Sequence, residues 1–282
     1  MMRLSVLDIL SPVHIPRLTR HLDALGYHRF WATEHHSPTQ SASPTLVACL
    51  AAAMTSRMRI GTAGILLNYA CPAKVAEDFR LLELYFPGRI DLGVAAGGVV
   101  DQALYLDGKS RPDRASFAAR VRALVELVRG DRVGPATATR PDLWLCGSSV
   151  SSAALAGELG MQFACHWRGR PSDTARTAIA AYHDAYRGAG APCAAIAAYG
   201  TCAATESAAR QLWSADDDSM SFVGTPRACV DQLHALISSS GADEAVIHLH
   251  IQDIDARLAG FQLLAEAAGL AIESDEAFAE AS

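Results

Sequence analysis

The feature that most constrains the fold of this chain is a repeated alternation of two kinds of segment. Short runs rich in β-branched and aromatic residues alternate with longer amphipathic segments rich in Ala and Leu. This alternation is typical of βαβ units, which build a parallel sheet covered by helices. Strands are predicted at 4–8, 29–33, 58–66, 90–95, 143–146, 162–166, 194–199 and 245–251. Helices are predicted at 15–25, 44–54, 72–85, 115–129, 152–159, 173–187, 226–239 and 254–268.

The number of alternations indicates the architecture. Eight strand–helix pairs without a break in composition favour a closed (β/α)8 barrel of the α/β class, a TIM barrel, over a doubly wound open sheet, which more often has about six strands. The length of 282 residues suits one barrel domain, and 50% of the residues are hydrophobic, enough for a large core. We therefore expect a single domain spanning residues 1–282.

Charge and cysteine usage narrow the class of protein. The formal net charge is -6 and the basic residues form no sustained block, which argues against nucleic-acid binding. The seven cysteines are scattered and contain no C-x-x-C pair, so we expect buried thiols in a reducing compartment, with no disulfide framework or metal site. The first residues are too short an apolar run for a signal peptide, and no segment reaches the ~18 apolar residues of a membrane span. A cytoplasmic protein that acts on small molecules is the expectation.

The most informative motif is Phe30-Trp31-Ala32-Thr33-Glu34-His35-His36, a strand that ends in a carboxylate and two imidazoles. Barrel enzymes carry out their chemistry at the carboxyl ends of their strands. Neighbouring side chains of an extended backbone point to opposite sides, so only one imidazole should face the pocket and the two should not share a metal. Seen alone, the motif is equally compatible with satisfied polar residues at a strand end.

Several motifs together resemble the bacterial luciferase-like family of flavin-dependent oxidoreductases. Over residues 26–93 the order and spacing are kept through Gly26-Tyr27, Glu34-His35-His36, Ser43-Pro44, Arg59-Ile60-Gly61-Thr62-Ala63-Gly64, Pro72-x-x-Val75-Ala76-Glu77-Asp78 and Pro87-Gly88-Arg89-Ile90-Asp91-Leu92-Gly93. Trp144-Leu145-Cys146-Gly147-Ser148-Ser149 and Phe222-Val223-Gly224-Thr225-Pro226 follow at the family's places. No single motif would suffice, but their order does.

The resemblance implies roles for residues near the flavin ring. His35 matches the family's pocket histidine, which acts as a general base or hydrogen-bonds the flavin, and Glu34 precedes it. A neutral imidazole can take and return a proton near neutral pH. Ala63-Gly64 matches a non-prolyl cis peptide beneath the flavin ring in relatives. The alternative for this pair is close packing at a strand bulge.

The resemblance also implies a phosphate site and an aromatic wall. Gly147, Ser148, Ser149 and Ser152 lie between a strand and a helix, where free backbone N–H groups, hydroxyls and the helix dipole can bind phosphate. Serines are also ordinary helix caps, so the pattern alone is weak. Trp167 matches an aromatic wall of the same pocket, although a single Trp is more often part of the core.

The chain departs from the family pattern at one position. Where relatives carry an arginine that binds the flavin phosphate, this chain continues Ala95-Ala96-Gly97. The resemblance implies a second phosphate-binding cation near Arg114, but a solvated surface arginine is an equal alternative. Compared with relatives, the chain is also shorter near 98–112 and 206–222, which predicts a more open pocket. Residues 206–224 are predicted to form a loop.

Two further histidines lie close together near the end of the sequence. His248 and His250 alternate with apolar residues on the last predicted strand. This places both imidazoles on one face, where buried, hydrogen-bonded histidines are the better interpretation and a metal site is not supported.

The leading hypothesis is a monooxygenase that uses reduced FMN (FMNH2) and O2 on a small organic substrate, with a separate flavin reductase as partner. The second is hydride transfer with a deazaflavin coenzyme, as in other branches of the family. The third is a non-catalytic flavin-binding or partner subunit, which the missing arginine motivates. Relatives dimerise through barrel helices, so a homodimer or a heterodimer with a homologue is expected. The residues do not identify the substrate.

Overall fold

The computed structural model describes residues 2–9, 12–37, 39–97, 113–166, 173–212 and 220–271. Eight parallel strands form a closed barrel, because β10 pairs with both β1 and β8. Around the ring they are β1 Arg3–Asp8, β2 Arg29–Ala32, β3 Arg59–Thr62, β5 Ile90–Ala95, β6 Asp142–Gly147, β7 Gln162–Cys165, β8 Ala194–Cys202 and β10 Glu244–Leu249. The predicted (β/α)8 barrel is confirmed.

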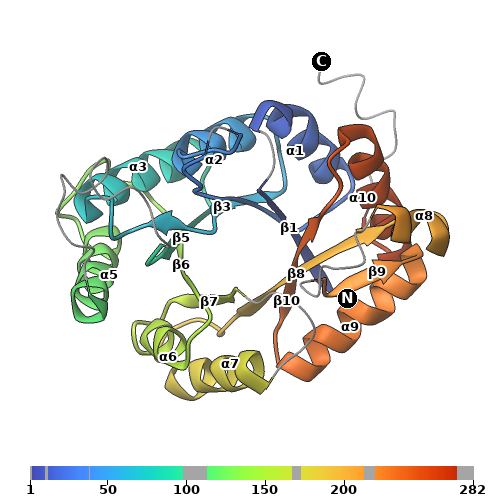
Figure 1. The fold of residues 1–282 in the computed structure, drawn as a ribbon. Helices are drawn as coiled ribbons and strands as arrows, with labels where there is room; N and C mark the ends of the chain where they lie inside the picture. The colour runs from blue at the N-terminus through green and yellow to red at the C-terminus, as the bar shows by residue number, and fades with distance from the viewer. Residues whose placement is uncertain are drawn as a thin grey trace.

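Helices surround the barrel on its outer side (Figure 1). They are α1 Ile15–Ala24, α2 Pro44–Ala53, α3 Pro72–Tyr85, α5 Arg114–Arg129, α6 Val150–Glu158, α7 Asp173–Ala185, α9 Pro226–Ser240 and α10 Ile254–Ala268, with a short 3-10 helix at Pro12–His14. Proline opens α2, α3 and α9, at the position where a missing backbone N–H costs least. Each of these helices overlaps a predicted one. Within the described ranges, no helix has both the length and the apolar character needed to cross a membrane.

Two segments differ from the sequence prediction. The predicted strand 58–66 is divided into β3 and the short β4 Ile65–Leu66, with Ala63 and Gly64 between them. The predicted loop 206–224 is wrong in part, because it contains α8 Glu206–Gln211 and β9 Phe222–Gly224. The hydroxyl of Thr205 accepts a hydrogen bond from the backbone N–H of Ala208 and so caps α8, and β9 pairs with the end of β8.

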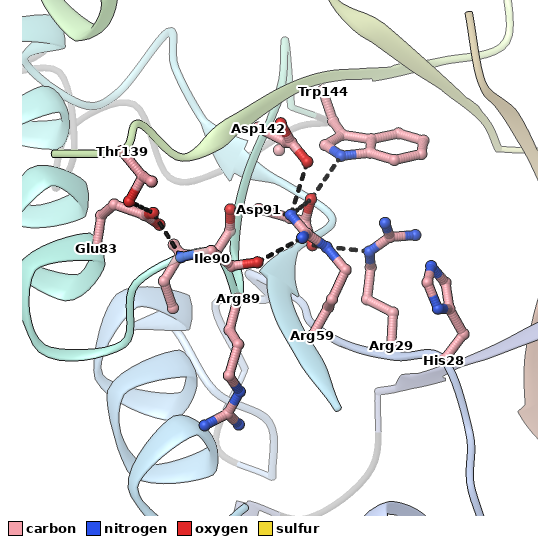
Figure 2. A network of polar contacts seen from close by, with 12 residues as sticks. His28, Arg29, Arg59, Glu83, Arg89, Ile90, Asp91, Thr139, Asp142 and Trp144 are labelled. Carbon is pink, nitrogen blue, oxygen red and sulfur yellow. Dashed lines mark hydrogen bonds and ion pairs between the residues drawn. The ribbon is translucent and has the colours of Figure 1, made fainter. Parts of the chain in front are cut away.

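The amino end of the barrel is filled by a buried charged network (Figure 2). The Arg29 guanidinium donates to Asp91 at 2.8 Å and to Glu244 at 2.6 and 2.7 Å, and it lies 4.7 Å from the centroid of the Trp144 ring. Asp91 also accepts from Arg59 at 2.9 Å and from the Trp144 indole N–H at 3.0 Å. Burial raises the pKa of Asp91, but the two guanidinium groups outweigh it and hold that pKa below its ordinary value. These residues connect five strands, β2, β3, β5, β6 and β10.

The cysteines are only partly as expected. All seven are free thiols, and Cys165, Cys193, Cys202 and Cys229 are buried. Cys49 and Cys71 are exposed, so the expectation of buried thiols is wrong for them. The reason is that Cys49 lies on the outer side of α2 and Cys71 immediately precedes α3.

Candidate active site

A cavity of about 740 Å³ opens at the carboxyl ends of the barrel strands. Its volume lies within the ~300–1,000 Å³ usual for small-molecule and cofactor sites. Small side chains leave room inside this end of the barrel: Ala63, Ala95, Ala164 and Ala197 all line the cavity. The same space contains Glu34, His35, Gly64, Ala96, Gly147, Ser148, Ser149 and Ser152, so the fold brings most of the predicted site residues together.

Both histidines at the end of β2 line the cavity, which corrects the expectation that only one would. The strand ends at Ala32, and the backbone then turns: the His35 N–H donates to the carbonyl of Ser41 at 2.8 Å. The alternation of an extended chain therefore no longer applies. His36 Nε2 lies 2.8 Å from Glu34 Oε1, while Glu34 Oε2 accepts from the backbone N–H of Leu66 at 2.9 Å.

The hydrogen bonds around Thr33 favour one tautomer of His35. The Thr33 hydroxyl donates to the carbonyl oxygen of Asp8 at 3.2 Å, and His35 Nδ1 lies 3.1 Å from the same hydroxyl oxygen. Because the Thr33 hydrogen is used on Asp8, Nδ1–H of His35 is the donor and Thr33 accepts. The lone pair of the neutral imidazole is then on Nε2, the nitrogen that can accept a proton.

Ala63 and Gly64 are joined by a cis peptide bond, as predicted, and both line the cavity. A Cβ on Gly64 would lie only 2.9 Å from the carbonyl carbon of Val94 on β5. Glycine is thus required for the close approach of this segment to β5. Ala63 and Gly64 pack closely against β5, which was the alternative interpretation, and they also line the cavity with small residues.

The start of α6 borders the cavity with hydroxyls and helix N–H groups. Ser149 is the N-cap, and its Oγ accepts from the Ser152 N–H at 3.2 Å and lies 2.9 Å from Ser152 Oγ. Arg114 is exposed and is absent from the cavity lining, but its Nη1 donates to Ser151 Oγ at 2.6 Å. A cation therefore lies next to the first turn of α6, where the helix dipole also favours an anion.

Two other predicted positions complete this side of the site. Ala96 lines the cavity, and its carbonyl accepts from Asn68 Nδ2 at 2.8 Å. A methyl group thus stands where the family resemblance leads one to expect a guanidinium. Trp167 lies outside the described residues.

The sequence interpretation missed the opposite wall. His166 and Tyr199 line the cavity, with His166 Nε2 3.1 Å from the Tyr199 hydroxyl. His248 is buried, and its Nδ1 donates to the carbonyl of Leu7 while its ring packs edge-on against Tyr199. His250 is exposed, so the prediction of a buried histidine is wrong for His250. Their positions could have identified them, because His166 and Tyr199 are the last residues of two predicted strands and barrel sites form at the carboxyl ends of strands.

Cys146 also lines the cavity. Burial raises the pKa of its thiol to about 12, so the group is neutral near pH 7. A nucleophilic cysteine requires the thiolate. Cys146 therefore presents a neutral thiol to the cavity near pH 7.

The model of the luciferase-like monooxygenase family (Bac_luciferase) matches residues 10–216, which include strands β2 to β8. The chain belongs to the luciferase-like monooxygenase family. The resemblance read from the motifs is confirmed.

The chain is similar to relatives of known and of unknown activity. An N-acetyl-S-alkylcysteine monooxygenase of Bacillus subtilis (strain 168) is 34% identical over 53% of this chain and 49% of its own length. YwcH of the same organism is 36% identical over 69% of this chain and 63% of its own length. The chain thus spans less than two thirds of the length of each of these two relatives.

Solved luciferase-like structures share the whole barrel. Apo-MsnO8 superposes with a TM-score of 0.85 at 28% identity, covering 97% of this chain and 100% of its own. The oxygenating constituent of 3,6-diketocamphane monooxygenase, solved with FMN, superposes with a TM-score of 0.76 at 17% identity, covering 97% of this chain and 100% of its own. The second likeness supports the fold alone.

Proposed function

We propose that this protein is a flavin-dependent monooxygenase that uses reduced FMN and O2 on a small organic substrate. The observation that carries the proposal is that one cavity joins the imidazole of His35 to the serine-rich start of α6. The first can move a proton, and the second can bind a phosphate. The family relatives named as monooxygenases support the same reaction.

The residues present fit a flavin. Gly147, Ser148, Ser149 and Ser152 would hold its phosphate, with Arg114 beside them. Ala63, Gly64, Ala95 and Ala96 would face the flat ring, since small side chains allow its close approach. Bound reduced FMN supplies two electrons and two protons, so that one oxygen atom of O2 enters the substrate and the other leaves as water.

The side chains at the end of β2 would transfer a proton in the cavity and hold the cavity wall in place. The Nδ1–H bond to Thr33 orients the His35 ring, so that Nε2 can take and return a proton at the cavity. The Glu34–His36 pair connects the end of β2 to β4 through the Leu66 N–H and holds that wall in place.

The direct test is a titration of the purified chain with FMN, reduced FMN, riboflavin and a deazaflavin coenzyme. FMN binding, followed by transfer of oxygen from isotope-labelled O2 into an added organic substrate in the presence of a flavin reductase and NADH, supports the monooxygenase. Oxygen consumption alone is not sufficient, because free reduced FMN reacts with O2 without an oxygenase. Preference for the deazaflavin would favour hydride transfer instead. One fold neighbour is named as an F420-dependent secondary alcohol dehydrogenase, and it superposes with a TM-score of 0.76 at 15% identity. Flavin binding without turnover would favour a non-catalytic subunit.

Charge reversal at the start of α6 tests the phosphate site. Ser149→Asp should lower FMN affinity at least tenfold and leave riboflavin affinity unchanged, because only FMN places a dianion against the new carboxylate. Aspartate caps helices as well as serine does, so α6 should persist. The matched variant is Ser149→Asn, a neutral cap of the same shape, which should keep more FMN affinity. Equal losses for both flavins in Ser149→Asp would move the phosphate elsewhere.

Adding the missing guanidinium tests the same site in the opposite direction. Ala96→Arg should tighten FMN binding about tenfold or more and riboflavin binding little, since a charge-assisted hydrogen bond contributes ~1.5–3 kcal/mol. Ala96→Gln, of similar length but neutral, is the matched control, and added salt should reduce the gain. If Ala96→Arg has no effect, Arg114→Ala made in both backgrounds shows whether Arg114 already holds the phosphate.

We also propose that the chain associates with a second copy or a homologue through the outer face of α2 and α3. Large apolar side chains are exposed there, at Leu46 and Leu50 on α2 and at Leu81, Leu84 and Tyr85 on α3. Apolar patches of this kind mark interaction surfaces. Sedimentation velocity over a concentration series measures the association.

A further inference from the structure

The inner end of the cavity contains a hydrogen-bond donor that the flavin proposal does not use. This end, the cavity floor, is lined by buried residues that include Leu7, Trp31, Ala197 and Val246. Within the described part of the chain, no atom accepts a hydrogen bond from the indole Nε1–H of Trp31. Buried N–H groups are almost always paired, because an unpaired one has lost its bonds to water without replacement. An acceptor that enters the cavity would therefore be stabilised by this group.

The packing of the indole indicates which way the N–H points. A Cβ on Gly61 of β3 would lie 2.5 Å from Cζ3 and 2.7 Å from Cε3 of Trp31, so the benzene edge of the indole packs against that glycine. Nε1 is on the other edge of an indole and therefore faces away from β3. The other neighbour of β2 is β1, whose Leu7 pairs with Trp31 and lines the cavity. The donor thus faces the β1 side of the cavity floor.

This side of the floor is separate from the residues proposed to hold the flavin. In the ring of eight strands, β1 is four strands away from β6 in either direction, and the proposed phosphate site directly follows β6. The small residues proposed to face the flavin ring come from the ends of β3 and β5. Leu7, Ala197 and Val246, from β1, β8 and β10, have side chains without polar atoms, so they would stabilise the carbon skeleton of a ligand by burying it.

The Trp31 ring is held in place by its neighbours. The ring of Trp144 packs edge-on against it, with the two centroids 5.2 Å apart. The Arg29 guanidinium lies 5.0 Å from the centroid of the Trp31 ring and is itself fixed by Asp91 and Glu244. A donor placed in this way is preorganised, so little entropy is lost when it binds an acceptor.

We propose that Trp31 is a specificity-determining residue whose Nε1–H donates a hydrogen bond to a carbonyl oxygen of the organic substrate, while the apolar residues of the floor bury the carbon skeleton. An indole nitrogen donates and does not accept. It therefore distinguishes a ligand that carries an acceptor oxygen from a hydrocarbon of the same shape. The inference rests on the proposed function, because it takes this cavity as the site of substrate binding.

The first measurement follows the donor directly, by nuclear magnetic resonance of the full chain with its tryptophans labelled with nitrogen-15. The chain has four tryptophans, and Trp31→Phe identifies the indole signal of Trp31. Acetophenone should bind and move the indole proton of Trp31 downfield, as a new hydrogen bond does. Ethylbenzene, in which a methylene group replaces the carbonyl, should move it much less. The Trp144 signal is the internal control, because its N–H already donates to Asp91 at 3.0 Å.

The second measurement is calorimetric titration of both probes into the full chain, with and without FMN. The ratio of acetophenone affinity to ethylbenzene affinity should fall roughly two- to tenfold in Trp31→Phe, the value of one neutral hydrogen bond. Because the two probes have nearly the same shape, the ratio cancels the loss of ring volume. Trp144→Phe is the matched control: it removes an indole N–H that is used on Asp91, from a residue outside the cavity lining, and should leave the ratio unchanged.

Three results would overturn the inference: no acetophenone binding by the folded wild-type chain, an unmoved Trp31 signal when acetophenone binds, or an unchanged affinity ratio in Trp31→Phe. A downfield shift of the same size on adding FMN alone would assign the donor to the flavin and overturn it as well. FMN binding and oxygen transfer are measured on the same samples. A chain that binds acetophenone through Trp31 but no flavin would contradict the proposed function and leave this inference standing.

Discussion

His35→Ala is expected to lower the rate of oxygenation by roughly 10²–10⁴-fold, the usual contribution of a positioned acid–base group. The loss should appear in turnover, with FMN affinity little changed, because the phosphate would be held at the start of α6. The exposed His35 side chain contributes little to the core, so the variant should remain folded. Stopped-flow measurement of single turnovers, with circular dichroism as the check on folding, gives the result.

His36→Ala is the matched control, since it removes an imidazole from the same cavity. Its loss frees Glu34 from a 2.8 Å contact, so a moderate effect through the position of that carboxylate is expected. Full activity in His35→Ala together with inactive His36→Ala would assign the proton transfer to His36. Partial recovery of His35→Ala by added imidazole would support His35.

Asp91→Asn is expected to lower the free energy of unfolding by about 3–5 kcal/mol, because it leaves the buried guanidinium of Arg29 with only part of its countercharge. The matched control is Asp142→Asn. The side chain of Asp142 is 60% exposed, and its carboxylate lies 2.7 Å from Arg59. An exposed pair of this kind contributes at most about 1 kcal/mol. Urea unfolding at pH 7 compares the two variants.

The pH dependence of this difference has a defined sign. The pKa of Asp91 in the folded chain lies below its ordinary value of 3.8, so the carboxylate stabilises the fold above that pH and the contribution is lost as the pH falls through the folded pKa. The gap between wild type and Asp91→Asn should therefore be constant above about pH 5 and narrow only in stronger acid. A gap that is absent at pH 7 would show that the network does not stabilise the barrel.

The order of strands and helices could be predicted because hydrophobic periodicity is a local property of the sequence. The charged network could not, since Arg29 is 62 positions from Asp91 and 215 from Glu244 and only closure of the barrel brings them together. The same reason hides Tyr199, which in a strand of small apolar residues resembles a core side chain. The error at His36 arose from extending a strand's geometry beyond Ala32, where the backbone turns.

The two ends of this barrel place different demands on substitution. At the amino end the charged residues are mutually dependent, so changes there should be tolerated only in compensating groups. At the carboxyl end, Ala164 and Ala197 are bounded by open space on the cavity side, so larger side chains can be accommodated without displacing packed neighbours. A library randomised at these two alanines would thus sample new substrate preferences while the melting temperature stays nearly constant, which makes the architecture a tolerant starting point for laboratory evolution.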